Sequence, residues 1–390
     1  MMDIERIRAE TPGLKHGIHL LACGSALAPQ PVIDAVKHHL DLEAQIGGYE
    51  AHKAEDAMLD ATYDSVARLI GARRHEIALL ENATAAWCQA FYALPLKAGD
   101  RVITCQAEYA ANYVAYLQRQ KRDGIEIDVV PNDESGALDV QALERMITDR
   151  TALVTITWVP TNGGLVNPAA EVGAIAKKAG VPFLLDACQA VGQMPVDVEA
   201  LNCDFLSATG RKFLRGPRGT GFLYIRDSWL QKLEPIMIDH FAAPWVTTDS
   251  YALRDDARRF ENWENSYALR AGLKVACDYA MALGIEAIEE RATMLADTLR
   301  ARISELEGAK VLDLGAKQCA IVSFTIDGLD PHSTVTALRD KGITIGASSP
   351  DSTRLDAEYR NLREMFRAAP HYFNNEADLD ALIVALKSQL

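Results

Sequence analysis

The chain has 390 residues, which is long for one compact core and indicates a large domain joined to a smaller one. Its formal net charge of −14 argues against nucleic acid or an anionic membrane as a general partner, because both bind clustered lysine and arginine. Neither an apolar run of roughly 18 residues nor a metal-binding cysteine pattern is present, and the scattered cysteines indicate free thiols in the cytoplasm.

Apolar, strand-like runs alternate with helix-length amphipathic segments from about residue 55 to about residue 225. Strands are expected at residues 76–81, 100–105, 125–131, 151–159, 181–186, 203–209 and 219–225, and helices at 85–94, 112–124, 139–147 and 168–180. This alternation is typical of an α/β domain in which crossover helices connect the strands of a parallel sheet.

The pattern changes after about residue 265. A long helical stretch at 266–306 precedes a strand at 319–326, and helices are expected at 331–342 and 375–390. That order predicts a smaller C-terminal α+β domain. We therefore expect an N-terminal segment (1–30) that packs on the small domain, a large α/β domain (31–264) and the small domain itself (265–390).

Polar residues that directly follow the predicted strands are the first candidates for a site, because parallel α/β sheets bind ligands beyond the carboxyl ends of their strands. Asp186 ends one strand. A buried carboxylate there would need a cationic partner such as a protonated heterocycle nitrogen, unless Asp186 caps the next helix. Lys212 lies in an arginine-rich turn after the strand at 203–209. In a partly dry pocket its amine would have a lowered pKa and act as a nucleophile; otherwise it is an ordinary surface lysine.

Three other stretches carry side chains that suit a ligand. Asn82, Ala83 and Thr84 begin a helix, whose free N–H groups suit a phosphate or form an ordinary cap. Tyr109 follows another strand, where it could lie against an aromatic ligand or pack at the rim of the core. Arg367 could bind a substrate carboxylate through two hydrogen bonds, or be a solvated surface residue.

The order and spacing of these motifs resemble the fold-type I enzymes that use pyridoxal 5'-phosphate, specifically the class V aminotransferase and cysteine desulfurase superfamily. The most specific motifs are "DACQ" (186–189) and "TGRK" (209–212), with Gly-Pro-x-Gly following the lysine. The resemblance implies a large, mostly parallel seven-stranded sheet domain with helices on both faces, and a smaller C-terminal domain. It also implies an amino acid substrate, no metal, and a homodimer with its active sites at the subunit interface.

The resemblance assigns a role to each candidate residue. Lys212 would carry the Schiff base and move the proton at Cα, Asp186 would pair with the pyridinium nitrogen, and Gln189 would approach the ring hydroxyl. The other implied contacts are Ala83, Thr84 and Thr209 at the phosphate, Tyr109 on the ring, Thr161 or Asn162 at the cofactor, and Arg367, Arg354 and Ser25 at the substrate.

Departures from the family pattern shape the expected reaction. Cysteine desulfurases carry a persulfide-forming cysteine in the loop that matches residues 343–356, and this loop has none, so we expect desulfuration to be disfavoured. The stretches "GGYEA" (47–51) and "FENWENS" (260–266) look most like hercynylcysteine sulfoxide lyases and isopenicillin N epimerase-like proteins. We therefore expect a lyase that acts by β-elimination, for example of a carbon–sulfur bond, with an aminotransferase as the alternative and an epimerase less favoured.

Overall fold

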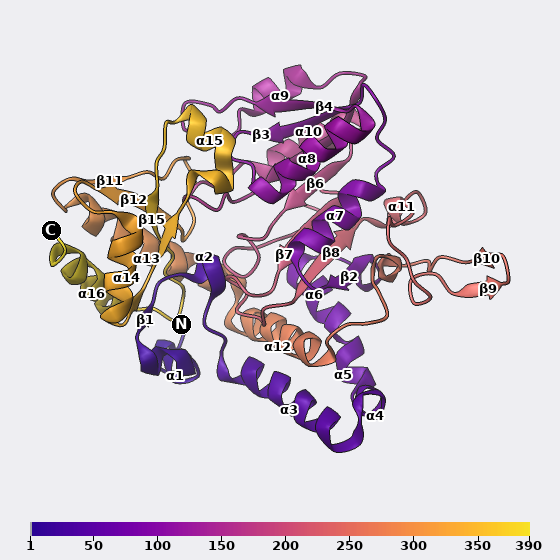
Figure 1. Cartoon of the computed structure of the whole chain (residues 1–390), viewed down its shortest axis with the longest axis horizontal. Helices are drawn as coiled ribbons and strands as arrows, with labels where there is room; N and C mark the ends of the chain where they lie inside the picture. Colours follow the sequence, from indigo (N-terminus) through magenta and orange to yellow (C-terminus); the bar gives the residue numbers. More distant parts are fainter. Residues whose placement is uncertain (1) are drawn as a thin grey trace.

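A seven-stranded sheet forms the centre of the computed structural model, which describes residues 2–390 (Figure 1). Its order is β2-β8-β7-β6-β5-β3-β4, and β8 runs in the direction opposite to the other six strands. The strands are β2 (Ile77–Leu80), β3 (Arg101–Cys105), β4 (Glu126–Val130), β5 (Thr151–Thr157), β6 (Phe183–Asp186), β7 (Phe205–Thr209) and β8 (Gly221–Ile225). The predicted mostly parallel sheet of seven strands is therefore confirmed.

Both faces of this sheet are covered, because its strands are buried and their side chains alternate between two cores. Phe222 and Leu223 are neighbours in β8 and belong to different cores. The core that contains Leu223 also receives α7 (Ala83–Ala93) and α8 (Ala110–Asp123). The core that contains Phe222 also receives α6 (Thr62–Ile70), α9 (Val140–Met146) and α10 (Ala169–Ala179).

The C-terminal part is built on a four-stranded antiparallel sheet in the order β11-β12-β15-β14. Its strands are β11 (Ala309–Val311), β12 (Val322–Ile326), β14 (Gly346–Ser348) and β15 (Met365–Ala368). The helices around it are α13 (Ile285–Ser304), α14 (Pro331–Asp340), α15 (Arg354–Tyr359), α16 (Glu376–Lys387) and the 3-10 turn η4 (Pro350–Thr353).

The long helical stretch expected at 266–306 is two helices, α12 (Tyr267–Leu283) and α13. Gly284 separates them with φ +88°, a left-handed conformation that glycine adopts readily and that ends the hydrogen-bond ladder of α12. Apolar periodicity continues across this position, so the sequence pattern alone reads as one helix.

The N-terminal residues lie against the C-terminal part of the chain (Figure 1). β1 (Ile18–His19) pairs in parallel with β13 (Ile343–Thr344), and Arg8 forms an ion pair of 2.8 Å with Asp378. The other early elements are α1 (Ile4–Ala9), η1 (Pro12–His16), α2 (Ala22–Ser25), α3 (Gln30–Ile46), α4 (Gly48–Ala54), α5 (Asp56–Asp60) and η2 (Arg74–Glu76).

Helix α12 packs on α3 and α6, so the first helix of the expected small domain rests on the large one. The domain limits at residues 30 and 264 therefore stay a prediction. The remaining elements are α11 (Asp227–Leu230), β9 (Trp245–Thr247), β10 (Ser250–Tyr251) and η3 (Ala257–Phe260). Within residues 2–390, no helix combines the length and apolar character needed to cross a bilayer.

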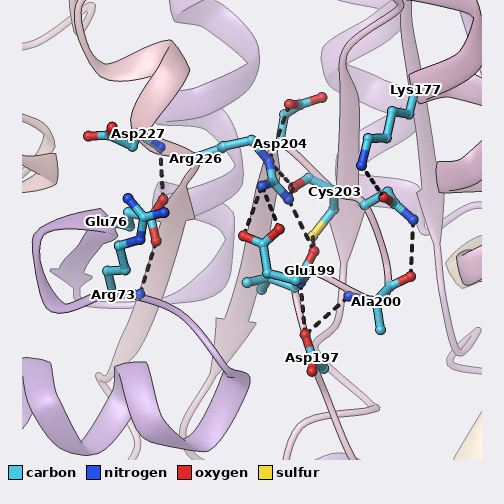
Figure 2. A network of polar contacts seen from close by, with 12 residues as sticks. Arg73, Glu76, Lys177, Asp197, Glu199, Ala200, Cys203, Asp204, Arg226 and Asp227 are labelled. Atoms are coloured by element: carbon cyan, nitrogen blue, oxygen red, sulfur yellow. Dashed lines mark hydrogen bonds and ion pairs between the residues drawn. The ribbon is translucent and has the colours of Figure 1, made fainter.

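Polar contacts tie the strands together at the edge of the sheet where β7 begins (Figure 2). Arg226 follows β8, forms a 2.9 Å ion pair with Glu199 and donates to the carbonyl of Cys203. Nearby, the carboxylate of Glu76 accepts the backbone N–H groups of Arg73 and Asp227, each at 2.9 Å. The polar groups at this edge form hydrogen bonds and ion pairs with one another, so their role is structural. The candidate site residues lie at the opposite edge of the sheet.

We expect Gly173→Ala to destabilise the chain, because a Cβ on this α10 residue would lie 1.9 Å from the carbonyl oxygen of Leu201. Overpacking of this kind should lower the free energy of unfolding by about 3 kcal/mol. Gly180→Ala is the matched control: it strains a φ of +70° but meets no atom within 4 Å, and should cost about 1 kcal/mol. Urea unfolding followed by circular dichroism measures both, and equal midpoints would contradict the expectation.

Candidate active site

Asp186 is a buried carboxylate at the carboxyl end of β6. Its two hydrogen-bond donors are uncharged: Asn112 Nδ2 donates to Oδ2 and the backbone N–H of Cys188 donates to Oδ1, both at 3.0 Å. Two neutral donors only partly offset the cost of burying the charge. The carboxylate is therefore placed to pair with a cation that binds at this edge.

Lys212 lies in the turn between β7 and β8, where its side chain is half-buried and partly removed from water. This desolvation lowers the pKa of Lys212, and the positive charge of Arg211 lowers it further. Cys188 and Asp186 act in the opposite direction and raise the pKa of Lys212. The turn thus favours the neutral, nucleophilic form of Lys212.

Arg215 holds the Lys212 turn against the N- and C-terminal parts of the chain. It is 1% exposed and adopts φ +62°, a strained conformation for a residue other than glycine. Its guanidinium donates to Leu27 O, Thr11 Oγ1 and Tyr372 Oη at 2.7, 2.7 and 2.9 Å. It also lies over the rings of Tyr372 and Phe373. The backbone N–H of Arg215 donates to the Lys212 carbonyl at 2.9 Å. We call these contacts of Arg215 the clamp, and they hold the backbone of Lys212 in place.

The start of α7 faces the same edge of the sheet. Asn82 caps the helix by accepting the N–H of Ala85 at 2.8 Å, and Thr84 is exposed beside it. Gly221 brings β8 close, since a Cβ there would lie 2.9 Å from the nitrogen of Ala83. Thr209 is buried and donates to Thr220 O at 3.2 Å. The helix start can bind an anion such as a phosphate.

Thr161 and Asn162 are adjacent in sequence but face different groups. Arg367 donates to the carbonyl and hydroxyl oxygens of Thr161 at 2.8 and 2.7 Å, and Gln189 donates to the same hydroxyl at 3.4 Å. Asn162 instead donates to Ser349 O at 3.0 Å. This arrangement favours Thr161 as the residue closer to Gln189 and Arg367.

Tyr109, Ser25 and Arg354 differ in how close they lie to these groups. Burial raises the pKa of Tyr109, and the charge of Asp186 raises it further. Ser25 ends α2, one residue after the Gly24 carbonyl that accepts a hydrogen bond from Arg211. Arg354 is exposed and forms ion pairs with two neighbouring carboxylates, Asp351 and Glu358. Its role at the substrate stays a prediction.

Two further residues lie in this region and were not predicted from the sequence. Glu108 is buried next to Tyr109 and shares the Asn112 amide with Asp186, and Arg215 clamps the Lys212 turn. Glu108 precedes Asn112 by four residues, a spacing that brings two side chains together on a helix and could have signalled the contact. Arg215 carried no such signal, because its acceptors come from residues far away in the chain.

These residues fit pyridoxal phosphate. Asp186 suits a protonated ring nitrogen, Lys212 suits the aldehyde carbon, and the start of α7 suits the phosphate. Two buried polar atoms that face this region have no partner within residues 2–390, namely Oε1 of Gln189 and Nε of Arg367. A cofactor and its substrate would offer such atoms hydrogen-bond partners.

Comparisons with known proteins agree with this arrangement. The family model described as "Aminotransferase class-V" matches residues 18–382. A "Probable cysteine desulfurase" of Methanothermobacter thermautotrophicus is 30% identical over 98% of this chain and 96% of its own length. Another protein of that name, from Xylella fastidiosa, is also 30% identical, over 98% of this chain and 95% of its own. The apo structure of a cysteine desulfurase from Thermococcus onnurineus superposes with a TM-score of 0.93 at 25% identity, covering 100% of this chain and 98% of that one.

These relatives overturn one expectation from the sequence. We disfavoured cysteine desulfuration, and placed a β-elimination lyase ahead of it, because the loop at 343–356 has no cysteine. The end-to-end matches are to proteins named cysteine desulfurases, so that exclusion was wrong. The loop at 343–356 bears only on one possible position of a sulfur acceptor, whereas Asp186 and Lys212, the predicted cofactor residues, come from the sheet edge.

We expect Arg215→Met to lower the free energy of unfolding by about 3 kcal/mol, because it leaves Leu27 O, Thr11 Oγ1 and Tyr372 Oη without their donor. Arg215→Lys should recover little, since an ammonium group cannot reproduce the fork of the guanidinium. Urea unfolding of the cofactor-free chain measures both. Arg218→Met, which alters an exposed residue of the same turn, is the control. If Arg215→Met lost no more stability than Arg218→Met, the proposed role of the Arg215 contacts would be contradicted.

Proposed function

The chain belongs to the aminotransferase class-V family of pyridoxal phosphate enzymes, and we propose that its reaction is the desulfuration of cysteine to alanine. The predicted superfamily and cofactor are thereby confirmed, and the narrower reaction is the proposal. The observation that carries it is the full-length similarity to proteins named cysteine desulfurases. The chemistry collected around Lys212 supports it, because desulfuration begins at the Cα–H bond of an amino acid.

Each group at the sheet edge has a defined task in this proposal. Bound pyridoxal phosphate supplies the electron sink for the pair released at Cα. Asp186 keeps a positive charge on the ring nitrogen, and Arg367 binds the α-carboxylate so that the Cα–H bond faces the amine. Lys212, whose pKa burial lowers, takes the proton from Cα and returns protons to the product.

The sulfur also needs an acceptor. Cys23 and Cys188 are the thiols coupled to the titration of Lys212, and burial raises the pKa of both, so they stay protonated and react slowly. We therefore propose that an external thiolate attacks the substrate sulfur. The new S–S bond forms as the C–S bond breaks, its electron pair stays on the substrate carbon, and protonation yields alanine. A second thiol then attacks the inner sulfur of the persulfide, which releases sulfide and joins the two thiols in a disulfide.

The narrower resemblance to hercynylcysteine sulfoxide lyases and isopenicillin N epimerase-like proteins rests on short stretches such as "FENWENS" (260–266). The similarity to proteins named cysteine desulfurases spans the whole chain. Full-length similarity outweighs matches of five to seven residues, so this proposal follows the desulfurases.

A homodimer in the cytoplasm completes the proposal. The hairpin β9–β10 projects away from the body of the molecule (Figure 1), and Trp245 on it is 74% exposed. Val246 and Tyr251 of the same hairpin are exposed too, as are Ile236 and Met237 shortly before it. Apolar groups gathered on a projecting arm indicate a protein contact, and a second copy would cover them. The seven cysteines, all free thiols, support a reducing compartment.

We expect the cofactor-loaded enzyme to convert L-cysteine, with excess dithiothreitol, into equal amounts of alanine and sulfide. Lys212→Met should abolish both products, since it removes the amine that moves the Cα proton in this proposal. Lys178→Met, which alters an exposed lysine of α10, is the control and should keep full activity. Amino acid analysis and a sulfide assay measure the products. Pyruvate and ammonia in place of alanine would contradict desulfuration.

We expect sedimentation experiments to show a dimer, and Trp245→Glu to weaken the association at least about tenfold, because a charge would replace a buried anchor. Val384→Glu is the matched control, since it alters an exposed apolar residue of α16 on another part of the surface. A wild-type monomer, or equal weakening by both changes, would argue against the hairpin contact.

A further inference from the structure

Glu108 is a buried acid that the proposed reaction does not use. It is 2% exposed and lies between β3 and α8, directly before Tyr109. Every donor to its carboxylate is uncharged. Oε1 accepts from Tyr109 N at 2.7 Å, Asn112 Nδ2 at 3.0 Å and Thr157 Oγ1, and Oε2 accepts from Thr104 Oγ1 at 2.6 Å and Tyr116 Oη at 3.1 Å.

The Asn112 side chain links this acid to the active site. Its Nδ2 group donates one hydrogen bond to Glu108 and one to Asp186, each at 3.0 Å. Because a carboxylate accepts only, two carboxylates flanking one amide require the NH₂ side to face both. Glu108 therefore fixes which way the Asn112 amide points, and the amide fixes one oxygen of Asp186.

Glu108 also holds the backbone of Tyr109. The Tyr109 N–H donates to Glu108 and, at 3.2 Å, to Thr157 Oγ1, whose own hydroxyl donates to Glu108. These bonds set the direction in which the chain leaves β3 and enters α8. The phenol of Tyr109 is carried by that backbone toward Asp186, Arg211 and Arg367, whose charges bear on it.

We propose that Glu108 is a positioning residue, which orients Asp186 through Asn112 and Tyr109 through its backbone, for contact with the bound cofactor. The proposal goes beyond the proposed reaction, because it rests on cofactor binding alone. Five groups donate hydrogen bonds to the Glu108 carboxylate, so it has no free position for a contact with the substrate. Burial raises the pKa of Glu108, and hydrogen bonds from Thr104, Thr157 and Asn112 oppose this rise.

The test compares Glu108→Ala with Glu108→Gln. The glutamine oxygen can still accept from Tyr109 and Asn112, while the hydroxyls of Thr104 and Tyr116 rotate to accept from its NH₂ group. Alanine removes all five contacts. We expect Glu108→Ala to weaken binding of pyridoxal phosphate and to lower kcat, each about tenfold, with KM nearly unchanged. The visible circular dichroism of the bound cofactor should fall. Glu108→Gln should restore cofactor affinity, kcat and dichroism.

Asn112→Ala provides an independent test if Glu108→Ala does not fold. It removes the link to Asp186 and keeps four of the donors to Glu108, so it should reproduce the loss of cofactor affinity. In the double variant the losses should not add, because both changes break one pathway.

Glu76→Ala is the matched control (Figure 2). This buried acid also accepts backbone N–H groups, at the opposite edge of the sheet, so it should lower the unfolding temperature without changing cofactor affinity. An unchanged affinity and dichroism in Glu108→Ala would overturn the proposal. So would a Glu108→Gln variant as impaired as the alanine variant, or an equal cofactor defect in Glu76→Ala. Cofactor affinity, visible dichroism and unfolding temperature are measured without any substrate, so these three readouts stand apart from the test of desulfuration.

Discussion

The site depends on the burial of Asp186 with only two uncharged hydrogen-bond donors. The negative charge of a carboxylate in that position is only partly stabilised, and a protonated ring nitrogen can stabilise it further. The same dry edge of the sheet lowers the pKa of Lys212, so the amine and the carboxylate favour opposite kinds of partner. Pyridoxal phosphate offers both, an electrophilic carbon and a basic nitrogen in one ring. The class-V match and the physical arrangement therefore lead to the same cofactor.

The strands and the residues at their ends could be predicted because both follow from local rules. All seven strand positions show as apolar runs, and Asp186 and Lys212 stand where such runs end. The break at Gly284 could not be read in the same way, since amphipathic helical periodicity is present on both of its sides. Arg215 was hidden because its acceptors, Thr11 and Tyr372, lie more than 150 residues away on either side.

The reaction was harder to predict than the cofactor. The groups that act at Cα are fixed by the sheet, and several reactions share them. The later steps of the reaction depend on where sulfur can go, and we inferred that from one loop without a cysteine. The relatives show why this was too narrow: similarity to desulfurases extends along the whole chain, while the loop covers only residues 343–356. An acceptor thiol need not belong to that loop.

The pairing of β1 with β13 has a consequence for biosynthesis. Residues 18–19 leave the ribosome early, yet their partners at 343–344 and the bridge from Leu21 to Ala369 appear only when translation is nearly finished. The carbonyl of Leu27 must likewise find Arg215 after nearly two hundred further residues have emerged. Until then β1 has no strand to pair with, and Arg215 lacks one of its three acceptors, Tyr372 Oη. The site as a whole is thus complete only when synthesis is nearly finished, because Arg367 and Tyr372 are among the last residues made.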